Sequence, residues 1–381
     1  MVLSKTILND QRRFDVKARR IGVALLIVTL LTLAISPRSV TLRARSNSIT
    51  YASSVWIHRT PAVSPLPLKN HKMAYDSTRN VTILFGGDDG TQLVSDTWEW
   101  DGEIWTLRTP PARPVARYFH AMAYDSTRNV VVLFGGRTSA INDPILGDTW
   151  EWDGTTWTER TPLTSPPARW IHAMAYDSAR GVVVLFGGSG NCGGACDDTW
   201  EWDGTTWTQR TPSTSPPFRW GHSMAYDSMR GVTILFGGRN FTDLGDTWEW
   251  DGIIWVQRFP SSGPSDLDTA SLVYDDARGV SILFGGYRDG QGYVADTWEW
   301  NGTLWTNTTS VTSPTPRDSM DMAYDSAREV CVMFGGYDGS IRLADTWEYT
   351  LLDSSGYLPI LLVPFGPLPG EELQHSIYRY P

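Results

Sequence analysis

Two kinds of segment recur along the chain: an uninterrupted apolar run, and a short stretch in which tryptophan alternates with polar residues. The first reads "GVVVLFGG" at residues 181–188, and the second reads "DTWEW" at residues 198–202. A continuous apolar run of this length is typical of a strand buried on both faces. Period-2 alternation places both tryptophans on one face of a strand. "HAMAYD" precedes the apolar run and "TWTQR" follows the alternating segment, so each unit is predicted to form four strands.

This four-strand unit occurs six times. The copies align on tyrosines that lie 48 to 52 residues apart, namely Tyr75, Tyr124, Tyr176, Tyr226, Tyr274 and Tyr324. Spacing within a unit is constant except between the paired glycines and the next Asp-Thr-Trp, where it ranges from 8 to 12 residues. "DG" or "NG" favours a tight hairpin between the third and fourth strands. The pattern predicts an all-β fold, a six-bladed β-propeller of four-stranded antiparallel blades.

The first segment that resembles the repeat matches the end of a unit, not its beginning. "WIHRTP" at residues 56–61 copies the close of a unit although no unit precedes it, and the sixth unit stops at "DTWEYT" without a fourth strand. Open strand edges are a liability. We therefore predict that residues 55–60 pair with residues 345–349 and close the ring by completing the last blade. The apolar segment 357–363 competes for the same place.

These residues together resemble the kelch repeat. The resemblance rests on the paired glycines after an apolar strand, the Tyr-Asp before it, and the tryptophan that follows the "DTWEW" strand. The period of about 50 residues agrees with that family. The departures are Leu272-Val273 in place of Met-Ala and Tyr349 in place of the second tryptophan. Kelch membership implies six or seven blades and leaves the chemistry open, because such propellers include both binding modules and enzymes.

The N-terminal residues 1–36 are predicted to be a signal peptide or a signal anchor. Six Lys or Arg residues precede the uncharged apolar run 21–35, which is short for a membrane span. Basic residues on this side of the run place the propeller outside the cytoplasm, either secreted or membrane-anchored. Residues 37–50 are then a linker, residues 51–350 the propeller, and residues 351–381 a C-terminal tail.

The charge distribution limits the partners. Residues 1–45 carry nine Lys or Arg and two Asp, a local charge of +7, so the rest carries −17 and the total is −10. An acidic body argues against nucleic acid, whose recognition needs a basic surface. We expect a monomeric propeller, and the sequence leaves open whether residues 21–35 attach it to a membrane.

Cysteine and histidine suggest little chemistry. Cys192 and Cys196 lie in one Gly-rich loop and are predicted to form a disulfide in an oxidising compartment, whereas Cys331 reads as a core residue. Histidines recur four residues before the repeated tyrosine, at His71, His120, His172 and His222. Equivalent positions of a ring are too far apart to share one ion, so we expect no metal site and no cofactor. The first tryptophan of each "DTWEW" segment (Trp98, Trp150, Trp200, Trp248, Trp298 and Trp347) is expected to fill the layer between blades.

One face of the predicted ring carries all the variation in loop length. Because strands alternate in direction, the loops after the paired glycines and those before the first strand of each unit share this face, and binding residues usually lie on such loops. Residues that break the sixfold pattern gather there. The predicted ligand-binding residues are Arg117, Tyr118, Arg137, Arg169, Trp170, Arg219, Trp220, Arg239, Tyr287 and Arg317. The kelch resemblance implies that the arginines at 117, 169, 219 and 317 contact acidic peptides. The alternative is that Tyr118, Trp170 and Trp220 only pack against neighbouring Pro-rich loops.

We therefore predict a non-enzymatic module that binds a protein or glycan ligand on this face, with no catalytic residues. Two alternatives remain. One is a propeller enzyme acting on carbohydrate, as an oxidase, an isomerase or a sialidase-like enzyme. The other is a surface-structural or adhesive protein. The cysteines are poorly placed for a Tyr–Cys copper oxidase, but an enzyme site assembled from different blades is compatible with the sequence.

Overall fold

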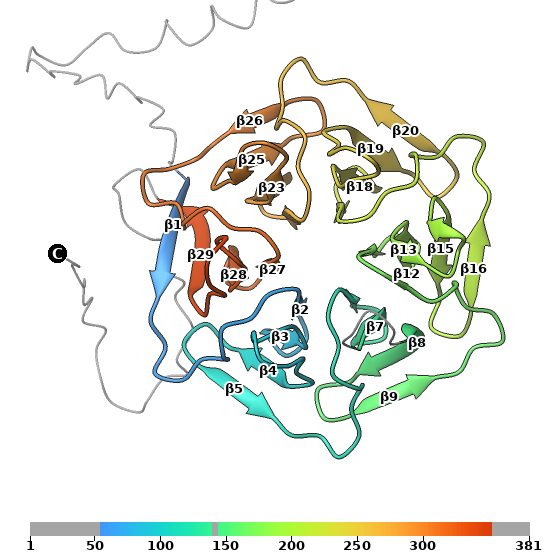
Figure 1. Ribbon diagram of the computed structural model, residues 1–381, viewed down its shortest axis with the longest axis horizontal. Helices are drawn as coiled ribbons and strands as arrows, with labels where there is room; N and C mark the ends of the chain where they lie inside the picture. Colours follow the sequence, from blue (N-terminus) through green and yellow to red (C-terminus); the bar gives the residue numbers. More distant parts are fainter. Residues whose placement is uncertain (1–53, 139–143, 353–381) are drawn as a thin grey trace, which may run out of the picture. The chain divides into compact units, whose positions relative to one another are not determined.

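The computed structural model describes residues 54–138 and 144–352. These residues form six four-stranded antiparallel sheets, together with one three-stranded and one two-stranded sheet. Figure 1 shows the six larger sheets in chain order around a common centre. Among the described residues, none belongs to a helix long and apolar enough to cross a membrane. The predicted signal segment, linker and tail beyond residue 352 lie outside the described residues.

Each large sheet has its first strand innermost and its fourth at the periphery (Figure 1). The innermost strands are β2 (Lys72–Asp76), β6 (Ala121–Asp125), β11 (Ala173–Asp177), β17 (Ser223–Asp227), β21 (Ser271–Asp275) and β27 (Asp321–Asp325). The second strands are β3 (Val81–Phe85), β7 (Val130–Arg137), β12 (Val182–Phe186), β18 (Val232–Phe236), β22 (Val280–Phe284) and β28 (Val330–Phe334). We number the sheets 1 to 6 in the order of these strands.

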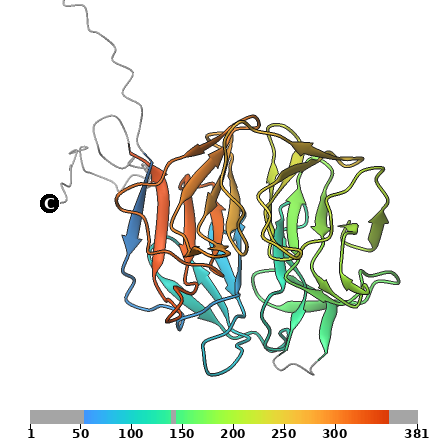
Figure 2. The ribbon, with the colours of Figure 1, turned by 45° about the horizontal axis from the view of Figure 1, so that its top comes forward.

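The third strands are β4 (Thr97–Trp100), β8 (Ile145–Trp152), β15 (Thr199–Trp202), β19 (Thr247–Trp250), β25 (Thr297–Trp300) and β29 (Thr346–Leu351). The outer strands are β5 (Trp105–Arg108), β9 (Trp157–Arg160), β16 (Trp207–Arg210), β20 (Trp255–Arg258), β26 (Trp305–Asn307) and β1 (Ser54–Arg59). Short strands lie in the loops: β10 (Arg169–Trp170), β13 (Ser189–Gly190), β14 (Gly194–Ala195), β23 (Tyr287–Arg288) and β24 (Gly292–Tyr293). Figure 2 shows the sheets from a tilted direction, with their strands running between the two ends of the ring.

The first strand of the described chain belongs to the last sheet. β1 pairs antiparallel with β29, with Trp56 opposite Tyr349 and Arg59 opposite Thr346. This is the pairing that the spare "WIHRTP" segment predicts, and it occupies the place for which residues 357–363 were the rival. Sheet 6 therefore combines residues from both ends of the repeat region.

The apolar runs form the buried middle of each sheet. In β3, for example, Ile83, Leu84 and Phe85 are all fully buried. Such a strand has neighbouring strands on both sides and neighbouring sheets against both faces. None of its side chains reaches solvent, so every position favours an apolar residue. The hydrophobic clusters accordingly combine residues of adjacent sheets, as in the packing of Phe85 against Trp157 with ring centroids 5.0 Å apart.

One hydrogen bond recurs at every contact between neighbouring sheets. The indole of the tryptophan in each outer strand donates to a threonine in the third strand of the preceding sheet, at 2.9–3.0 Å. The six pairs are Trp105–Thr346, Trp157–Thr97, Trp207–Thr149, Trp255–Thr199, Trp305–Thr247 and Trp56–Thr297. β1 thus supplies the bond between sheets 6 and 5.

The predicted tryptophans pack at the contacts between sheets, but other aromatic residues lie deeper there. The first tryptophan of "DTWEW" is mostly half-buried, and at Trp150, Trp200, Trp248 and Trp347 its indole donates to the aspartate two residues earlier. The second tryptophan and the one in the outer strand are buried instead, as for Trp152 and Trp157 at 1–2 % exposure. Alternation puts the two tryptophans of "DTWEW" on one face, but sequence does not reveal how deeply each lies.

A second ring of bonds lies near the centre. The residue two before each innermost strand has φ between 54° and 68°, and its N–H donates to the carbonyl of the equivalent residue in the preceding sheet at 2.8–3.3 Å. These residues are Asn70, Phe119, Ile171, Gly221, Thr269 and Ser319. Positive φ is unfavourable for Ile and Thr. Its repetition shows that the circle of hydrogen bonds imposes this backbone conformation.

We expect Trp56→Ala to lower the free energy of unfolding by about 3–5 kcal/mol, because it removes a buried indole and its bond to Thr297. Trp56→Phe should cost less, since most of the packing remains. His58→Ala, an exposed change in the same strand, should cost less than about 1 kcal/mol. Urea unfolding of the three variants measures these differences. Equal, small losses for Trp56→Ala and His58→Ala would show that β1 contributes little to the fold.

Candidate functional site

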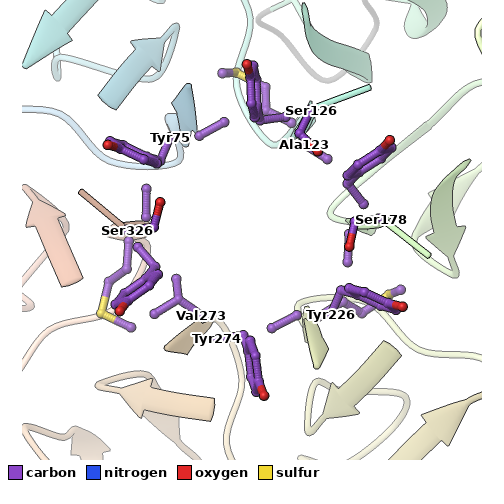
Figure 3. A pocket seen from close by; sticks show the side chains of 18 of the residues that line it. Tyr75, Ala123, Ser126, Ser178, Tyr226, Val273, Tyr274 and Ser326 are labelled. Atoms are coloured by element: carbon purple, nitrogen blue, oxygen red, sulfur yellow. The ribbon is translucent and has the colours of Figure 1, made fainter. Parts of the chain in front are cut away.

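A row of cavities follows the innermost strands through the centre of the ring. The cavity at one end, of about 340 Å³, is formed by nearly identical residues from all six sheets, and Figure 3 shows its tyrosines arranged around the centre. Several tyrosine hydroxyls bond to the neighbouring turn, as Tyr124 does to Thr78 at 2.8 Å. The lining residues at this end are nearly the same in every sheet, so no side of the cavity differs chemically from the others.

The opposite end holds a pocket of about 360 Å³ whose residues differ from sheet to sheet. We call it the mouth pocket. Its floor includes most of the circle of positive-φ residues described above. The residues that line it are Lys69, Asn70, Phe119, Ile171, Trp220, Asp268, Thr269, Tyr287, Tyr293, Asp318, Ser319 and Tyr337. It lies on the face that carries the loops of variable length.

Backbone pairing fixes the side chains of the mouth pocket. In each sheet, the residue just before the positive-φ position pairs with the residue that follows the paired glycines. The pairs are Lys69–Asp88, Tyr118–Arg137, Trp170–Ser189, Trp220–Arg239, Asp268–Tyr287 and Asp318–Tyr337. These twelve positions therefore form a regular frame around the pocket, although their side chains share no common chemistry.

Acidic and aromatic groups dominate one side of the pocket. Burial and, after it, the nearby carboxylate of Asp243 raise the pKa of Asp268 to about 7, although Arg239 partly offsets both. Oδ1 of Asp268 is buried and accepts no hydrogen bond from the described residues. Burial also raises the pKa of Asp318, whose Oδ2 accepts a bond from Thr269 at 3.0 Å.

Tyrosine rings form the wall beside these carboxyl groups. Tyr293 contacts both Tyr287 and Tyr337, with ring centroids 5.2 and 5.7 Å apart. The ammonium group of Lys69 lies 4.5 Å from the centroid of the Tyr337 ring. Aromatic rings, carboxyl groups and one cation thus meet in a single recess.

The structure divides the predicted ligand-binding residues. Trp220 and Tyr287 line the mouth pocket. Tyr118 and Trp170 are not among the lining residues, but both pack against Phe119, which does line the pocket. The guanidinium of Arg137 lies 4.9 Å from the centroid of the Trp170 ring. Arg239 pairs with Asp289 at 2.8 Å and with Asp243 at 3.4 Å.

The four repeated arginines do not reach the surface. The side chains of Arg117, Arg169, Arg219 and Arg317 are 0–1 % exposed. Each makes two bonds of 2.6–2.9 Å to the aspartate of an Asp-Thr-Trp segment, namely Asp148, Asp198, Asp246 and Asp345. Their predicted contact with a ligand is therefore corrected: these arginines hold loops together. Sequence spacing cannot show this, because a buried Arg–Asp pair and an exposed arginine look alike.

The repeated histidines lie below the floor of the mouth pocket. All four are buried, and each packs edge-on against a phenylalanine of the preceding sheet, with centroids 5.6 Å apart. Burial lowers the pKa of His71 and His222 to about 3. Within residues 54–138 and 144–352, no group of three or more His, Cys, Asp or Glu could hold a metal ion. The histidines act as packing residues of the channel.

The cysteines are placed as the sequence predicts. Cys192 and Cys196 form a disulfide in the loop of sheet 3, and Cys331 is a buried free thiol in β28.

Sequence reasoning left several pocket residues out of the predicted site. Lys69, Asp268 and Asp318 occupy the same repeat position as Trp220, and their departure from the aromatic pattern is the signal that could have selected them. Tyr293 lies in the loop of variable length, where the repeats align poorly. Its contribution becomes visible only when β23 and β24 bring it beside Tyr287.

Comparison with known proteins supports the fold alone. No protein-family model and no curated protein matches the chain. Among solved structures, it is similar to one titled "Structure of YjhT", with a TM-score of 0.60 and 15% identity, over 77% of this chain and 98% of that one. The chain has a β-propeller-like fold. At this level of identity the likeness carries no information about the mouth pocket.

Arg169→Met should lower the free energy of unfolding by about 3–5 kcal/mol, because it leaves the Asp198 carboxylate without its cation. Burial would raise the pKa of Asp198, but the bonds from Arg169 outweigh it and lower that pKa. Adding Asp198→Asn should recover much of the loss, which urea unfolding of both variants measures. If the double variant is no more stable than Arg169→Met, the pair is not the source of the stability.

The buried histidines should make the fold sensitive to acid. Between about pH 6.5 and pH 3, the unfolded chain binds protons that folded His71 excludes, because burial and then the Lys72 charge lower its pKa. The free energy of unfolding should therefore fall as pH is lowered through this window. His71→Met copies Met320 at the equivalent position and should flatten the slope near pH 5 by about 1.4 kcal/mol per pH unit. Urea unfolding at pH 6.5, 5.5 and 4.5 measures the slope, and an identical slope in the variant would contradict the assignment.

Proposed function

We propose that the chain is a six-bladed kelch propeller, closed by β1, that binds a sugar unit of a glycan in the mouth pocket without transforming it. The blade count is supported by the six four-stranded sheets and by the pairing of β1 with β29. The kelch assignment is supported by the repeated Tyr-Asp, paired glycines and tryptophans of the sequence.

The observation that carries this function is the chemistry of the mouth pocket. Its volume of about 360 Å³ lies in the range of small-molecule sites, about 300–1,000 Å³. Aromatic rings such as Trp220 and Tyr287 offer apolar faces to the C–H faces of a sugar, while Asp268 and Asp318 accept hydrogen bonds from hydroxyl groups. A stable protein partner would bury about 800 Å² on each side, so a recess of this size favours a glycan over a protein ligand.

We propose a location outside the cytoplasm. The basic segment and apolar run of residues 1–35 favour export, and the Cys192–Cys196 disulfide fits an oxidising compartment. Attachment to the membrane through residues 21–35 and a monomeric state belong to the same proposal.

One observation favours the enzyme alternative. A carboxyl group with a pKa of about 7 beside a second carboxyl group, as at Asp268 and Asp318, can act as a general acid on a glycoside. Turnover of a bound glycan that is lost in Asp268→Asn would replace the binding function by this one.

Trp220→Ala should weaken glycan binding by about tenfold or more, because it removes an aromatic wall of the pocket. Trp170→Ala is the matched control: it changes the equivalent position of sheet 3, outside the pocket lining, and should alter affinity by less than about twofold. A glycan array on the full-length protein identifies the ligand, and isothermal titration calorimetry measures both variants. If Trp170→Ala abolishes binding while Trp220→Ala leaves it unchanged, the mouth pocket is not the binding site.

A further inference from the structure

We propose that the mouth pocket selects a sugar that carries a free ammonium group, as an amino sugar does, over its N-acetylated or neutral counterpart. The inference rests on the proposed glycan binding and adds the chemical class of the ligand. It is carried by a pocket-lining carboxyl group that has no ion pair among the described residues, an aromatic wall, and a glycine whose lack of a side chain leaves room for that carboxyl group.

The carboxyl group of Asp268 lacks a cation of its own. Oδ1 is buried and accepts no hydrogen bond from the described residues. The neighbouring guanidinium of Arg239 is already paired with Asp289 and Asp243. The nearby carboxyl groups of Asp243 and Asp318 add negative charge. The carboxyl group lines the mouth pocket, and an ammonium group placed beside it would supply the missing charge.

The aromatic wall suits the same group. The ammonium of Lys69 lies 4.5 Å from the centroid of the Tyr337 ring, a distance at which cation–π attraction operates. The Tyr337 ring thus shows that this wall attracts an ammonium group, although Lys69 itself occupies that face. Trp220, Tyr287 and Tyr293 line the same recess and provide further ring faces for a ligand.

Gly221 lies directly against the carboxyl group of Asp268. A Cβ atom built on Gly221 would lie 1.8 Å from Oδ1 of Asp268 and 3.0 Å from its Cγ. The backbone does not demand glycine here, because the other five members of the hydrogen-bonded circle adopt similar φ angles of 54° to 58° with side chains. Glycine is therefore explained by the space that the Asp268 carboxyl group occupies.

The chain as a whole favours a cationic ligand. Its net charge is −10, and the residues after the basic N-terminal segment are more acidic still. A field of this sign attracts cations and repels acidic sugars. The acidic side of the mouth pocket therefore adds to a long-range attraction rather than opposing it.

The test compares the trisaccharide of glucosamine with that of N-acetylglucosamine, by isothermal titration calorimetry on the full-length protein at pH 7. We expect the glucosamine trisaccharide to bind at least about tenfold more tightly, a difference of about 1.4 kcal/mol. Asp268→Asn, which keeps the shape and removes the charge, should reduce the preference to within about twofold. Gly221→Ala, which displaces the carboxyl group, should do the same. Melting temperatures confirm that both variants are folded, and Asp318→Asn serves as a further variant if one is not.

The outcomes separate the two proposals. Equal binding of both trisaccharides, weakened in each case by Trp220→Ala, would overturn the amine preference and leave glycan binding in place. A preference for glucosamine that survives in Asp268→Asn would overturn the assignment to Asp268. Absence of binding by either trisaccharide and by every glycan of an array would overturn both proposals.

Discussion

The hydrogen bond from an outer-strand indole to a threonine of the neighbouring sheet is the interaction on which the rest of the structure depends. It occurs at all six contacts between sheets, and each time it lies beside a buried aromatic pair such as Trp152 and Trp157, whose ring centroids are 5.5 Å apart. A tryptophan buried here needs a partner for its N–H, so the threonine of "DTW" recurs with it. The bond between sheets 6 and 5 comes from Trp56 in β1.

This repetition has a consequence for function. The buried strands, the Arg–Asp pairs and the histidine–phenylalanine contacts are used several times over, which marks them as parts of the scaffold. A ligand with a particular shape and charge needs groups that occur once. The mouth pocket meets that need because the frame of paired backbone positions is regular while its side chains differ, from Lys69 through Trp220 to Asp268 and Asp318.

Much of the fold and part of the candidate site could be predicted from the sequence. The pairing of the "WIHRTP" segment with the last repeat follows from counting strands, and the buried second strands follow from their apolar runs. Burial of polar side chains could not be predicted: Arg117 and its equivalents were expected at the surface because their aspartate partners lie about 30 residues away. Tyr293 and Gly221 were not predicted as site residues for a related reason. Their roles depend on contacts with Tyr287 and Asp268, which the sequence does not show.

A crystal structure of the full-length protein with bound glucosamine trisaccharide tests the central claim most directly. We predict density for an amino sugar in the mouth pocket, with its nitrogen within hydrogen-bond distance of the Asp268 carboxyl group and its ring against Trp220 or a tyrosine of the wall. Density at the tyrosine end of the channel, or on the outer strands with an empty mouth pocket, would contradict the claim that the residues breaking the sixfold repeat form the binding site.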